Sequence, residues 1–585
     1  MKKTKIVCTI GPASERKDVF EALVNSGLNV ARLNFSHGTH QEHQARIDVI
    51  KEVRREIRKP IAILLDTKGP EIRTGSFQEP SVQLEEGQEY ILTTREVEGT
   101  KEICSVSYKA LAQDVKPGDT ILIDDGLVSL RVKEIKDQTD IYCRVENAGE
   151  VKNHKGVNVP SVKINLPAIT DKDKADIEFG IKNGIDFIAA SFVRKARDVL
   201  AIREILEENN AEKIKIISKI ENQEGIDNLA EIIEASDGIM VARGDLGVEI
   251  PTEEIPLAQK DMIRRCNRVG KPVITATQML DSMIRNPRPT RAEATDVANA
   301  ILDGTDAIML SGETAAGKYP VEAVQMMTQI AMRTEASINY RDLMRQKAND
   351  KETSMTDAIS DATTHIAMDL DAAAIITATS SGHTARMVSK FRPSQLVIAA
   401  TTDRQVTRQL ALSWGTYAVL TEYLESTDDI IDTSIAKALE CNLIERGDLV
   451  VITAGVPVGI AGTTNLIKAH IVGEVIVNGT GIGSESYTGT VKILTEDPSS
   501  WEKLKEGDVL VSEFTDAEMV PVMEKAGALI VEAGGLTSHA AVIGLNIHTP
   551  TVVGAHDATK TLKDGDIVTV DTARGQIYSG RTKVL

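Results

Sequence analysis

Residues 213–225 have the sequence KIKIISKIENQEG, an apolar run that ends in charged and polar residues. Such a run is typical of a strand that is buried on both faces of a parallel sheet. Similar runs occur before and after it, separated by helix-like segments such as Asp18–Ser26 and Gln41–Arg58. The runs predicted to be strands are Lys5–Ile10, Ala31–Ser36, Ala62–Thr67, Phe187–Val193, Lys215–Glu221, Gly238–Arg243, Pro272–Thr277 and Ala307–Ser311. Eight strands that alternate with helices predict an α/β fold of the (β/α)8 TIM barrel type.

An open, doubly wound sheet has the same alternation of strands and helices and is the alternative. The polar residues favour the barrel, because they occur at or just past the carboxyl ends of the predicted strands. In a barrel these ends form the active-site face. The residues are Asn34, Asp66, Arg194, Glu221, Asp245, Thr277 and Glu313.

The rhythm of strands and helices changes along the chain. After about Gly69, strand-and-turn segments such as EEGQEYILTT (85–94) predict an inserted β domain. A second α/β rhythm begins near Thr356, after the polar segment RQKANDKETS (345–354). The residues from Gly473 on are rich in glycine, valine and threonine. We therefore expect a barrel domain in residues 1–69 and 171–345, an inserted β domain in 70–170, a second α/β domain in 346–473 and a separate domain in 474–585.

The composition excludes several classes of protein. The net charge is −19, so most of the surface would repel nucleic acid and anionic membranes. No apolar run reaches the ~18 residues of a transmembrane helix, and the first residues lack the apolar core of a signal peptide. The five cysteines are scattered without C-x-x-C spacing, which argues against disulfides and zinc and fits a reducing cytoplasm. A phosphate ligand would therefore need a local cluster of cations.

Three charged residues converge on two neighbouring predicted strands. Lys219 and Glu221 are two residues apart at the end of one strand, so their side chains face the same side. The next strand continues into Gly244 and Asp245 and supplies a second carboxylate. An ion pair across the barrel mouth is the alternative for Lys219 and Glu221. Two carboxylates with open positions suit Mg²⁺ or Mn²⁺ rather than zinc, and Lys219 would face the anion that the metal binds.

Other strand ends supply further candidate ligands. Arg32 and Arg73 suit fork-like binding of phosphate oxygens. Thr277 precedes a predicted helix, whose first amides could bind an anion, although a threonine that only caps the helix is the alternative. Hard oxygen donors with a single negative charge form a fair site for a monovalent cation. These donors are Asn34, Ser36, Asp66 and Thr67.

Seven motifs together resemble the pyruvate kinase family. They are TKIVCTIGPAS (4–14), VARLNFSHG (30–38), LLDTKGPEIRTG (64–75), IISKIENQEG (216–225), VARGDLGVEIP (241–251), ATQMLDSM (276–283) and MLSGETAAGKYP (309–320). The resemblance extends in order from about Thr4 to Val472 and includes the inserted segment. It implies a barrel with a β lid after the third strand, an α/β effector domain and a homotetramer. It also implies transfer of the phosphoryl group of phosphoenolpyruvate to ADP, which gives pyruvate and ATP.

The resemblance assigns roles to the residues at the barrel mouth. Glu221 and Asp245 would bind Mg²⁺, and Lys219 would neutralise charge on the phosphoryl group during transfer. Arg32 and Arg73 would hold phosphoryl oxygens.

The substrate carboxylate is expected at the Gly244 and Asp245 amides and at Thr277. Water near Thr277 and Ser311 would deliver the proton to the enolate carbon.

A K⁺ site and a nucleotide site are also implied by the resemblance. K⁺ would be bound by Asn34, Ser36, Asp66 and Thr67. Glu71 supports this assignment, because family members that need K⁺ have glutamate there and K⁺-independent members have lysine. The nucleotide would contact Asn34, Ser36, His37, Arg73 and, from the lid, Lys155.

The predicted effector domain contains TATSSGHTARMV (377–388), in which hydroxyls and amides precede a helix. Such a loop can bind phosphate, although an ordinary capped helix is the alternative. The resemblance implies an allosteric site for a phosphorylated effector. The residues concerned are Thr379, Ser380, Ser381, Gly382, His383 and Thr384.

The last segment contains GGLTSHAAV (534–542), which resembles the swivelling phosphohistidine domain of phosphoenolpyruvate synthase and pyruvate, phosphate dikinase, and this resemblance implies a swivelling-type domain in 474–585. His539 occupies the position that is phosphorylated in those enzymes. They usually follow this motif with an arginine that this chain lacks, and no domain able to load His539 from ATP is apparent. We therefore expect a structural or interaction role for this domain.

Two sequence motifs resemble a phosphate-binding P-loop and a histidine metal site, but we assign neither function to them. Residues 312–318 fit the start of a phosphate-binding P-loop, but Tyr319 occupies the position that needs a serine or threonine for Mg²⁺. His37, His40 and His43 are spaced so that they drift around a helix. We interpret them as solvated residues at a helix start rather than as a metal cluster.

Two other functions compete with the favoured kinase. A dikinase-like enzyme would relay phosphate through His539 and depend on AMP and phosphate. A non-catalytic metabolite sensor would bind the same ligands without turnover, and the intact Lys219, Glu221 and Asp245 argue against it.

Overall fold

The computed structural model describes most of the chain, which forms two compact units. The first unit comprises Met1–Thr353, Ser389–Arg392 and Asp403–Ala418, and the second comprises the remaining segments from Ser354 on. The described residues are 1–160, 162–348, 354–424, 426–455, 464–473, 475–495 and 497–582.

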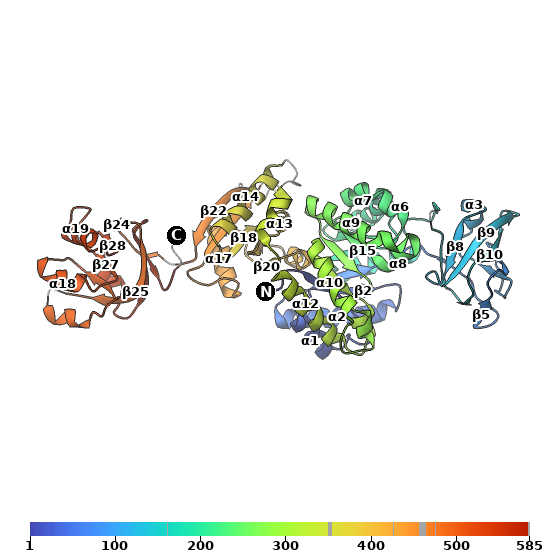
Figure 1. The fold of residues 1–585 in the computed structure, drawn as a ribbon, viewed down its shortest axis with the longest axis horizontal. Coiled ribbons are helices and arrows are strands. Elements are labelled where there is room, and N and C mark those ends of the chain that lie inside the picture. Colours follow the sequence, from blue (N-terminus) through green and yellow to red (C-terminus); the bar gives the residue numbers. More distant parts are fainter. Residues whose placement is uncertain are drawn as a thin grey trace. The chain divides into compact units, whose positions relative to one another are not determined.

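The first unit contains a closed barrel of eight strands in the order β1-β17-β16-β15-β14-β13-β3-β2. Figure 1 shows β15 among the green helices of this unit. All neighbouring strands in the barrel are parallel. The strands are β1 (Lys5–Thr9), β2 (Val30–Asn34), β3 (Ala62–Asp66), β13 (Phe187–Ala190), β14 (Lys215–Ile220), β15 (Gly238–Ala242), β16 (Val273–Ala276) and β17 (Ala307–Leu310). The predicted barrel and its eight strands are confirmed, and the open sheet is excluded.

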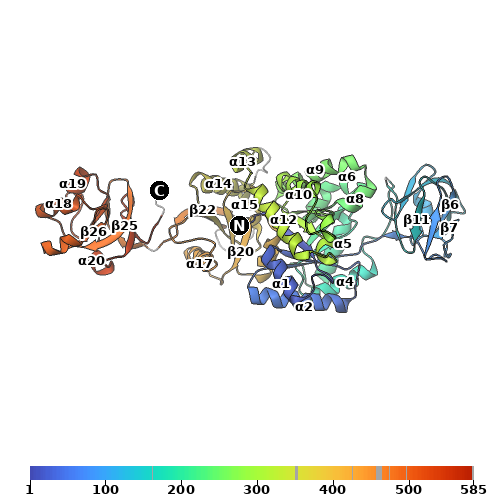
Figure 2. The same ribbon diagram turned by 60° about the horizontal axis from the view of Figure 1, so that its bottom comes forward.

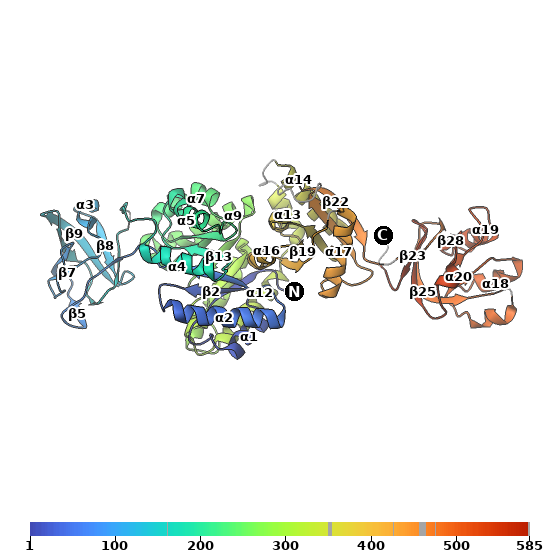
Figure 3. The ribbon, with the colours of Figure 1, turned by 180° about the vertical axis from the view of Figure 1, so that it is seen from behind.

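Helices cover the outside of the barrel (Figure 3). The helices of this unit include α1 (Lys17–Ser26), α2 (His40–Ile57), α4 (Asp171–Lys182), α5 (Ala196–Glu208), α6 (Gln223–Asp227), α7 (Leu229–Ala235), α8 (Arg243–Glu249), α9 (Ile255–Val269), α10 (Arg291–Asp303), α11 (Gly312–Ala315), α12 (Pro320–Glu335) and α13 (Tyr340–Ala348). The unit also contains α16 (Arg404–Gln409) and short 3₁₀ turns at Thr252–Glu254, Asp281–Ile284 and Leu410–Leu412.

The local sequence explains the start and the orientation of α2. Thr39 and Glu42 form a capping box that satisfies the first amides of the helix. His43, Ile47 and Ile50 follow at helical spacing and are buried. The prediction of a solvated His43 is therefore wrong, because its ring stacks on Phe35 at 3.9 Å and its Nε2 atom lies 2.9 Å from the His37 carbonyl oxygen.

The inserted domain interrupts the barrel after β3 and has its own apolar core (blue and cyan in Figure 2). Its main sheet has the order β4-β12-β8-β9-β10-β6-β7, and β11 pairs with β5 in a separate ribbon. The elements are β4 (Ile72–Arg73), β5 (Ser81–Leu84), β6 (Glu89–Thr93), β7 (Ile103–Ser105), α3 (Leu111–Asp114), β8 (Thr120–Ile123), β9 (Val128–Lys136), β10 (Asp140–Val145), β11 (Gly149–Lys152) and β12 (Gly156–Asn158). Strands β4 and β12 pair with each other, so the chain enters and leaves this domain side by side.

The α/β domain that follows has a five-stranded sheet in the order β20-β19-β18-β21-β22. Its elements are α14 (Met355–Asp369), β18 (Ala374–Ala378), α15 (His383–Ser389), β19 (Leu396–Thr401), β20 (Thr416–Leu420), α17 (Thr427–Glu440), β21 (Leu449–Gly455) and β22 (Thr464–Ile471). The predicted polar linker at 345–354 begins within α13, and its residues 349–353 lie outside the described residues.

The last domain is built on an eight-stranded sheet in the order β23-β30-β29-β25-β26-β27-β28-β24. Its elements are β23 (Val475–Asn478), β24 (Thr480–Ile482), β25 (Ser486–Ile493), a 3₁₀ turn (Pro498–Lys503), β26 (Val509–Ser512), a 3₁₀ turn (Ala517–Met519), α18 (Val520–Met523), β27 (Ala528–Val531), α19 (His539–Asn546), β28 (Thr551–Val553), α20 (Ala558–Thr561), β29 (Ile567–Asp571) and β30 (Gln576–Ser579). Within the described part of the chain, none of the helices combines the length and the hydropathy needed to cross a membrane.

Candidate active site at the mouth of the barrel

The strand register brings the predicted site residues together at one end of the barrel. Asn34 of β2 lies opposite Asp66 of β3, and Arg32 lies two residues earlier on β2. Lys219 of β14 lies opposite Met240 of β15, so Glu221 and the start of α8 follow at neighbouring positions. Parallel strands therefore deliver these polar side chains to the carboxyl-end face, as the sequence predicts.

Lys219 lies at the centre of a buried charge cluster. Its Nζ atom is 2.8 Å from Glu221 Oε1 and 3.3 Å from Asp66 Oδ1. It also donates a hydrogen bond of 2.8 Å to Ser191 Oγ. Glu221 and Asp66 are each 1% exposed, so the ammonium is held among carboxylates in a region without bulk water. The ion pair that the sequence offered as an alternative is present in this structure.

Arg32 contributes a second buried cation to the same cluster. Its Nε atom donates to Asp66 Oδ2 at 2.6 Å, and one terminal nitrogen donates to Thr9 Oγ1 at 2.7 Å. Asp66 therefore bridges the two cations. Burial alone would raise the pKa of Asp66, but Arg32 and Lys219 outweigh burial and hold that pKa below its usual range.

The carboxyl groups of Glu221 and Asp245 differ from that of Asp66, because their pKa values are raised rather than lowered. Burial, opposed by Lys219 and reinforced by Asp245, raises the pKa of Glu221 to about 7. Burial also raises the pKa of Asp245. Burial alone would lower the pKa of Lys219, but Asp66 and Glu221 outweigh it and raise that pKa. Two cations thus face three carboxylates, and this leaves an excess of negative charge.

This donor set fits a divalent cation. The Oε1 atom of Glu221 is buried and accepts no hydrogen bond of normal geometry, although the Lys219 ammonium lies 2.8 Å away. Its Oε2 atom accepts a hydrogen bond of 2.5 Å from the Phe192 amide. Among the described residues, no three His, Cys, Asp or Glu side chains could hold a metal by themselves. The carboxylates of Glu221 and Asp245 supply oxygen donors of the kind that Mg²⁺ shares with water and phosphate.

Thr277 and Gly244 lie against each other. A Cβ atom added to Gly244 would lie 2.6 Å from Thr277 Cγ2, so only glycine allows this approach. Thr277 does not precede an α-helix as predicted, because Thr277 and Gln278 have left-handed φ values of 73° and 56°. Arg243 holds this strained turn by donating to the Ala276 and Thr277 carbonyl oxygens.

Ser311 follows β17 at the same face of the barrel. Its amide donates a hydrogen bond of 2.8 Å to the side chain of Glu313, which also accepts from the Leu280 amide. Glu313 thus fixes the turn that carries Ser311. Residues 312–318 contain the four-residue helix α11, Gly312–Ala315.

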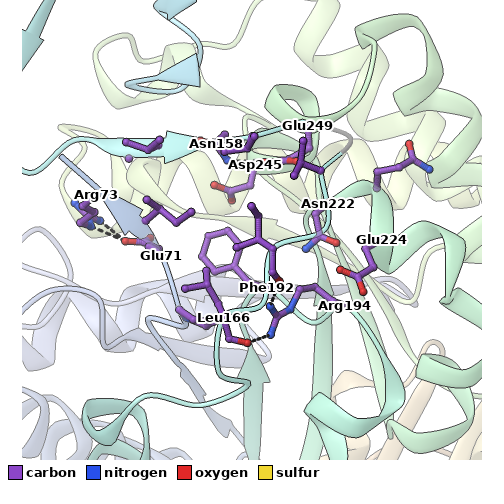
Figure 4. A pocket seen from close by; sticks show the side chains of 18 of the residues that line it. Glu71, Arg73, Asn158, Leu166, Phe192, Arg194, Asn222, Glu224, Asp245 and Glu249 are labelled. Carbon is purple, nitrogen blue, oxygen red and sulfur yellow. Dashed lines mark hydrogen bonds and ion pairs between the residues drawn. The ribbon is translucent and has the colours of Figure 1, made fainter. Parts of the chain in front are cut away.

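A cavity of about 330 Å³ opens beside this cluster, between the inserted domain and the barrel. Arg73 donates a hydrogen bond of 2.6 Å to Glu71 (Figure 4). It also donates to the His154 carbonyl oxygen at 2.7 Å. Lys155 pairs with Asp124 at 2.9 Å. The cavity thus brings together five residues that the sequence singled out, namely Glu71, Arg73, Lys155, Arg194 and Asp245.

Other predicted ligands lie outside the lining of this cavity. His37 is exposed in the loop between β2 and α2. The Asn34 side chain accepts a hydrogen bond from the Ser36 amide at 3.1 Å. The Thr67 hydroxyl donates a hydrogen bond of 3.3 Å to the Ala189 carbonyl oxygen. These contacts order the β2 and β3 ends beside Asp66.

Three residues of the site were missed from the sequence. Ser191 joins Lys219 to Thr67, because its hydroxyl also donates to the Thr67 carbonyl oxygen at 2.7 Å. Phe192 aims its amide at Glu221. Arg243 stabilises the Thr277 turn. The sequence signal for Ser191 was a serine that directly follows an apolar run. It was overlooked because the predicted strand extended to Val193 and so included this serine.

The second unit contains the other two predicted sites. A cavity of about 110 Å³ is lined by five of the six predicted effector residues, Gly382 being the exception. In the last domain, His539 is the first residue of α19, and its Nδ1 atom lies 2.9 Å from Thr515 Oγ1.

Comparison with known proteins connects these observations. Residues 1–324 match the model of the pyruvate kinase barrel domain, and residues 357–470 match that of the pyruvate kinase alpha/beta domain. Residues 504–575 match the mobile domain of PEP-utilising enzymes. The pyruvate kinases of Bacillus licheniformis and Geobacillus stearothermophilus are 56% and 55% identical to this chain over the full length of both proteins. A crystal structure of a pyruvate kinase from Cryptosporidium parvum is 44% identical in sequence to this chain and superimposes on it with a TM-score of 0.77. The match covers 80% of this chain and 96% of the Cryptosporidium chain.

The barrel, its buried cations and carboxylates, and these matches define a phosphotransferase. The barrel match covers more than half of the chain, and full-length relatives are more than 50% identical. The chain belongs to the pyruvate kinase family.

Proposed function

We propose that the chain acts in the cytoplasm and transfers the phosphoryl group of phosphoenolpyruvate to ADP, giving pyruvate and ATP. The observation that carries this proposal is the buried cluster of Lys219 with Glu221 and Asp66, which has Asp245 beside it. Phosphoryl transfer depends mainly on positioning and on electrostatic stabilisation, and a buried, ordered ammonium supplies both.

Each charged group at the mouth has a role in this reaction. Glu221 and Asp245 would hold Mg²⁺ or Mn²⁺, which when bound neutralises charge on the phosphoryl oxygens. Lys219, held by Ser191, points its ammonium at the same place and stabilises the charge that moves between donor and acceptor. Arg32 adds a second cation whose direction is fixed by Asp66.

The turn after β16 orients the other end of the substrate. The amides of Gly244 and Asp245 with the hydroxyl of Thr277 would bind the carboxylate of phosphoenolpyruvate. Their close approach, which only glycine permits, supports this assignment. Water ordered near Thr277 and Ser311 would protonate the enolate after the phosphoryl group has left.

The nucleotide and a K⁺ ion complete the proposed site. Arg73 and Lys155 line the cavity beside Asp245 and would bind the nucleotide phosphates. His37, Asn34 and Ser36, which lie outside this lining, would make further contacts with the nucleotide. K⁺ would bind at the ends of β2 and β3, where the register places Asn34 opposite Asp66. The ligands would be Asn34, Ser36, Asp66 and Thr67.

A spectrophotometric assay tests this function. Purified full-length protein with phosphoenolpyruvate, ADP, Mg²⁺ and K⁺ should form pyruvate, and omission of either cation should reduce the rate strongly. Turnover that needs AMP and phosphate instead of ADP would favour the dikinase-like alternative. In that case acid-labile phosphate would accumulate on His539, and His539→Ala would abolish turnover.

We also propose that the loop Thr379–Thr384 binds a phosphorylated effector. The hydroxyl-rich cavity of the α/β domain supports this, because hydroxyls and amides at a helix start suit phosphate. A panel of sugar phosphates should lower the phosphoenolpyruvate concentration at half-maximal rate in the wild type but not in Ser380→Ala. Light scattering would test the proposed homotetramer.

A further inference from the structure

One hydrogen bond joins the inserted domain to the helix that carries Asp245. The Nδ2 atom of Asn158, at the end of β12, donates to Glu249 Oε1, the last residue of α8, at 2.8 Å. Within the described residues, no other hydrogen bond or ion pair joins residues 72–158 to the barrel residues 1–69 and 171–348. On the segment that returns to the barrel, the Ile164 and Leu166 carbonyl oxygens accept hydrogen bonds from Arg194 of the barrel. The Asn158 and Glu249 side chains both line the cavity beside Asp245 (Figure 4).

The bond reaches the proposed metal site through a short helix. Asp245 and Glu249 are four residues apart on α8, so their side chains lie on the same face. A Cβ atom on Gly126 of the inserted domain would lie 3.9 Å from Val248 Cγ1. The inserted domain therefore rests on α8, and any movement of β12 away from the barrel must break the Asn158–Glu249 bond.

The same strand carries the residues proposed for the nucleotide. Lys155 immediately precedes β12, and Gly156 lies opposite Arg73 in the β12–β4 register. Asp124, the partner of Lys155, donates its amide to the Gly156 carbonyl oxygen at 3.0 Å. Fixing Asn158 on α8 thus fixes Lys155 and Arg73 relative to Asp245.

The chemistry of the pair suits a contact that opens and closes. Glu249 is a half-buried carboxylate, and burial raises its pKa while the Asn158 hydrogen bond opposes that shift. Losing the donor would leave a poorly solvated charge beside Asp245, so the bond favours the closed arrangement.

We propose that Asn158 and Glu249 are positioning residues that latch the lid in the arrangement needed for nucleotide binding and transfer, an inference that rests on the proposed function. Neither residue touches the reacting atoms. They act through Lys155 and Asp245, so the latch should set the KM for ADP and the kcat together.

Variants that exchange the donor and the acceptor of the Asn158–Glu249 hydrogen bond test the latch. Asn158→Asp places two carboxylates opposite each other and should reduce kcat/KM for ADP by about 10- to 100-fold, the range for losing a hydrogen bond to a charged group. Asn158→Asp combined with Glu249→Gln restores a donor and an acceptor in the opposite direction and should recover kcat/KM to within about threefold of the wild type. Glu249→Gln alone keeps an accepting oxygen and should lose no more than about threefold.

A matched control and a readout without turnover complete the design. Gln138→Glu adds the same charge to an exposed turn of the lid and should leave kcat/KM unchanged. Hydrogen–deuterium exchange should be faster at 156–158 and 243–249 in Asn158→Asp and normal in the double variant, whether or not the proposed reaction occurs. Wild-type exchange in Asn158→Asp, or no recovery in the double variant, would overturn the latch.

Discussion

The two ends of the barrel both bury charges, but they satisfy them differently. At the base, Asp306 accepts from Arg392 at 2.9 Å through one oxygen and from the Val273 amide at 3.0 Å through the other. Asp186 likewise accepts from Arg408 at 2.7 Å and from the Ile63 amide at 2.9 Å. Each of these carboxylates accepts hydrogen bonds on both oxygens, one from an arginine and one from the backbone amide at the start of a strand.

At the mouth the charges are not matched in this way. Asp66 is shared between Arg32 and Lys219, and Lys219 is itself shared between Asp66 and Glu221, whose Oε1 atom lies 2.8 Å from the ammonium without a hydrogen bond of normal geometry. Asp245 adds a further negative charge. The difference is consistent with the proposed function, in which base charges hold the strands together, whereas mouth charges would keep binding capacity for a metal ion and a phosphoryl group. Four variants test this distinction.

The largest effect is expected for Lys219→Met at the mouth. The kcat should fall by about 10³-fold, because the ammonium that stabilises transferring charge is lost. The free energy of unfolding should fall by no more than about 2 kcal/mol, because Arg32 still balances Asp66 and Glu221 can take up a proton. Steady-state kinetics and urea unfolding measure the two effects.

The reverse pattern is expected for Arg392→Met at the base. Asp306 would be left buried without its cation, so stability should fall by about 3–5 kcal/mol. The kcat of the molecules that remain folded should stay within about threefold of the wild type. A variant that kept its urea midpoint but lost turnover would break the comparison.

A smaller loss at the mouth is expected for Ser191→Ala. Lys219 would lose the hydroxyl that orients it, and kcat should fall about 5- to 10-fold, as for a single hydrogen bond. Ser218→Ala is the matched control, because the Ser218 hydroxyl pairs with Ser236 at 2.6 Å rather than with the site. Equal losses in both variants would show that strand packing, not Lys219 orientation, is responsible.

The smallest effect concerns Lys5, a buried lysine at the base. Burial and nearby Lys2 lower its pKa to about 7 against the opposing effect of Glu335, and its ammonium lies 2.6 Å from the Thr416 carbonyl oxygen. Between pH 7 and about 10.5 the unfolded chain binds a proton there that the folded chain does not, so stability from this group rises with pH. Lys5→Met should therefore reduce the slope of stability against pH, by at most about 1.4 kcal/mol per pH unit. An unchanged slope would contradict the lowered pKa.

Much of this arrangement follows from local sequence patterns. The barrel strands were predicted because short apolar runs repeat between helices, and the strand period of two residues placed Lys219 and Glu221 on one side. Ser191 was missed because the strand ends at Ala190 and Phe192 adopts a left-handed φ of 55°. That turn depends on tertiary contacts, which no local pattern records.

Long-range contacts were likewise invisible in the sequence. Asn158 and Glu249 are 91 positions apart, and they meet only because β12 returns to the barrel over α8. The left-handed turn at Thr277 depends on Arg243, from another strand end, to hold its carbonyl oxygens. The sequence therefore identified charged groups at strand ends but not the contacts that orient them.

The most direct test of the central claim is a ³¹P NMR time course with phosphoenolpyruvate, ADP, Mg²⁺ and K⁺. With the wild type, the phosphoenolpyruvate signal should decay as the ATP γ-phosphate signal grows in equal amount. With Lys219→Met at the same folded concentration, both changes should be about 10³-fold slower. Equal rates for the two proteins, or decay to inorganic phosphate without ATP, would contradict the assignment of phosphoryl transfer to the mouth of the barrel.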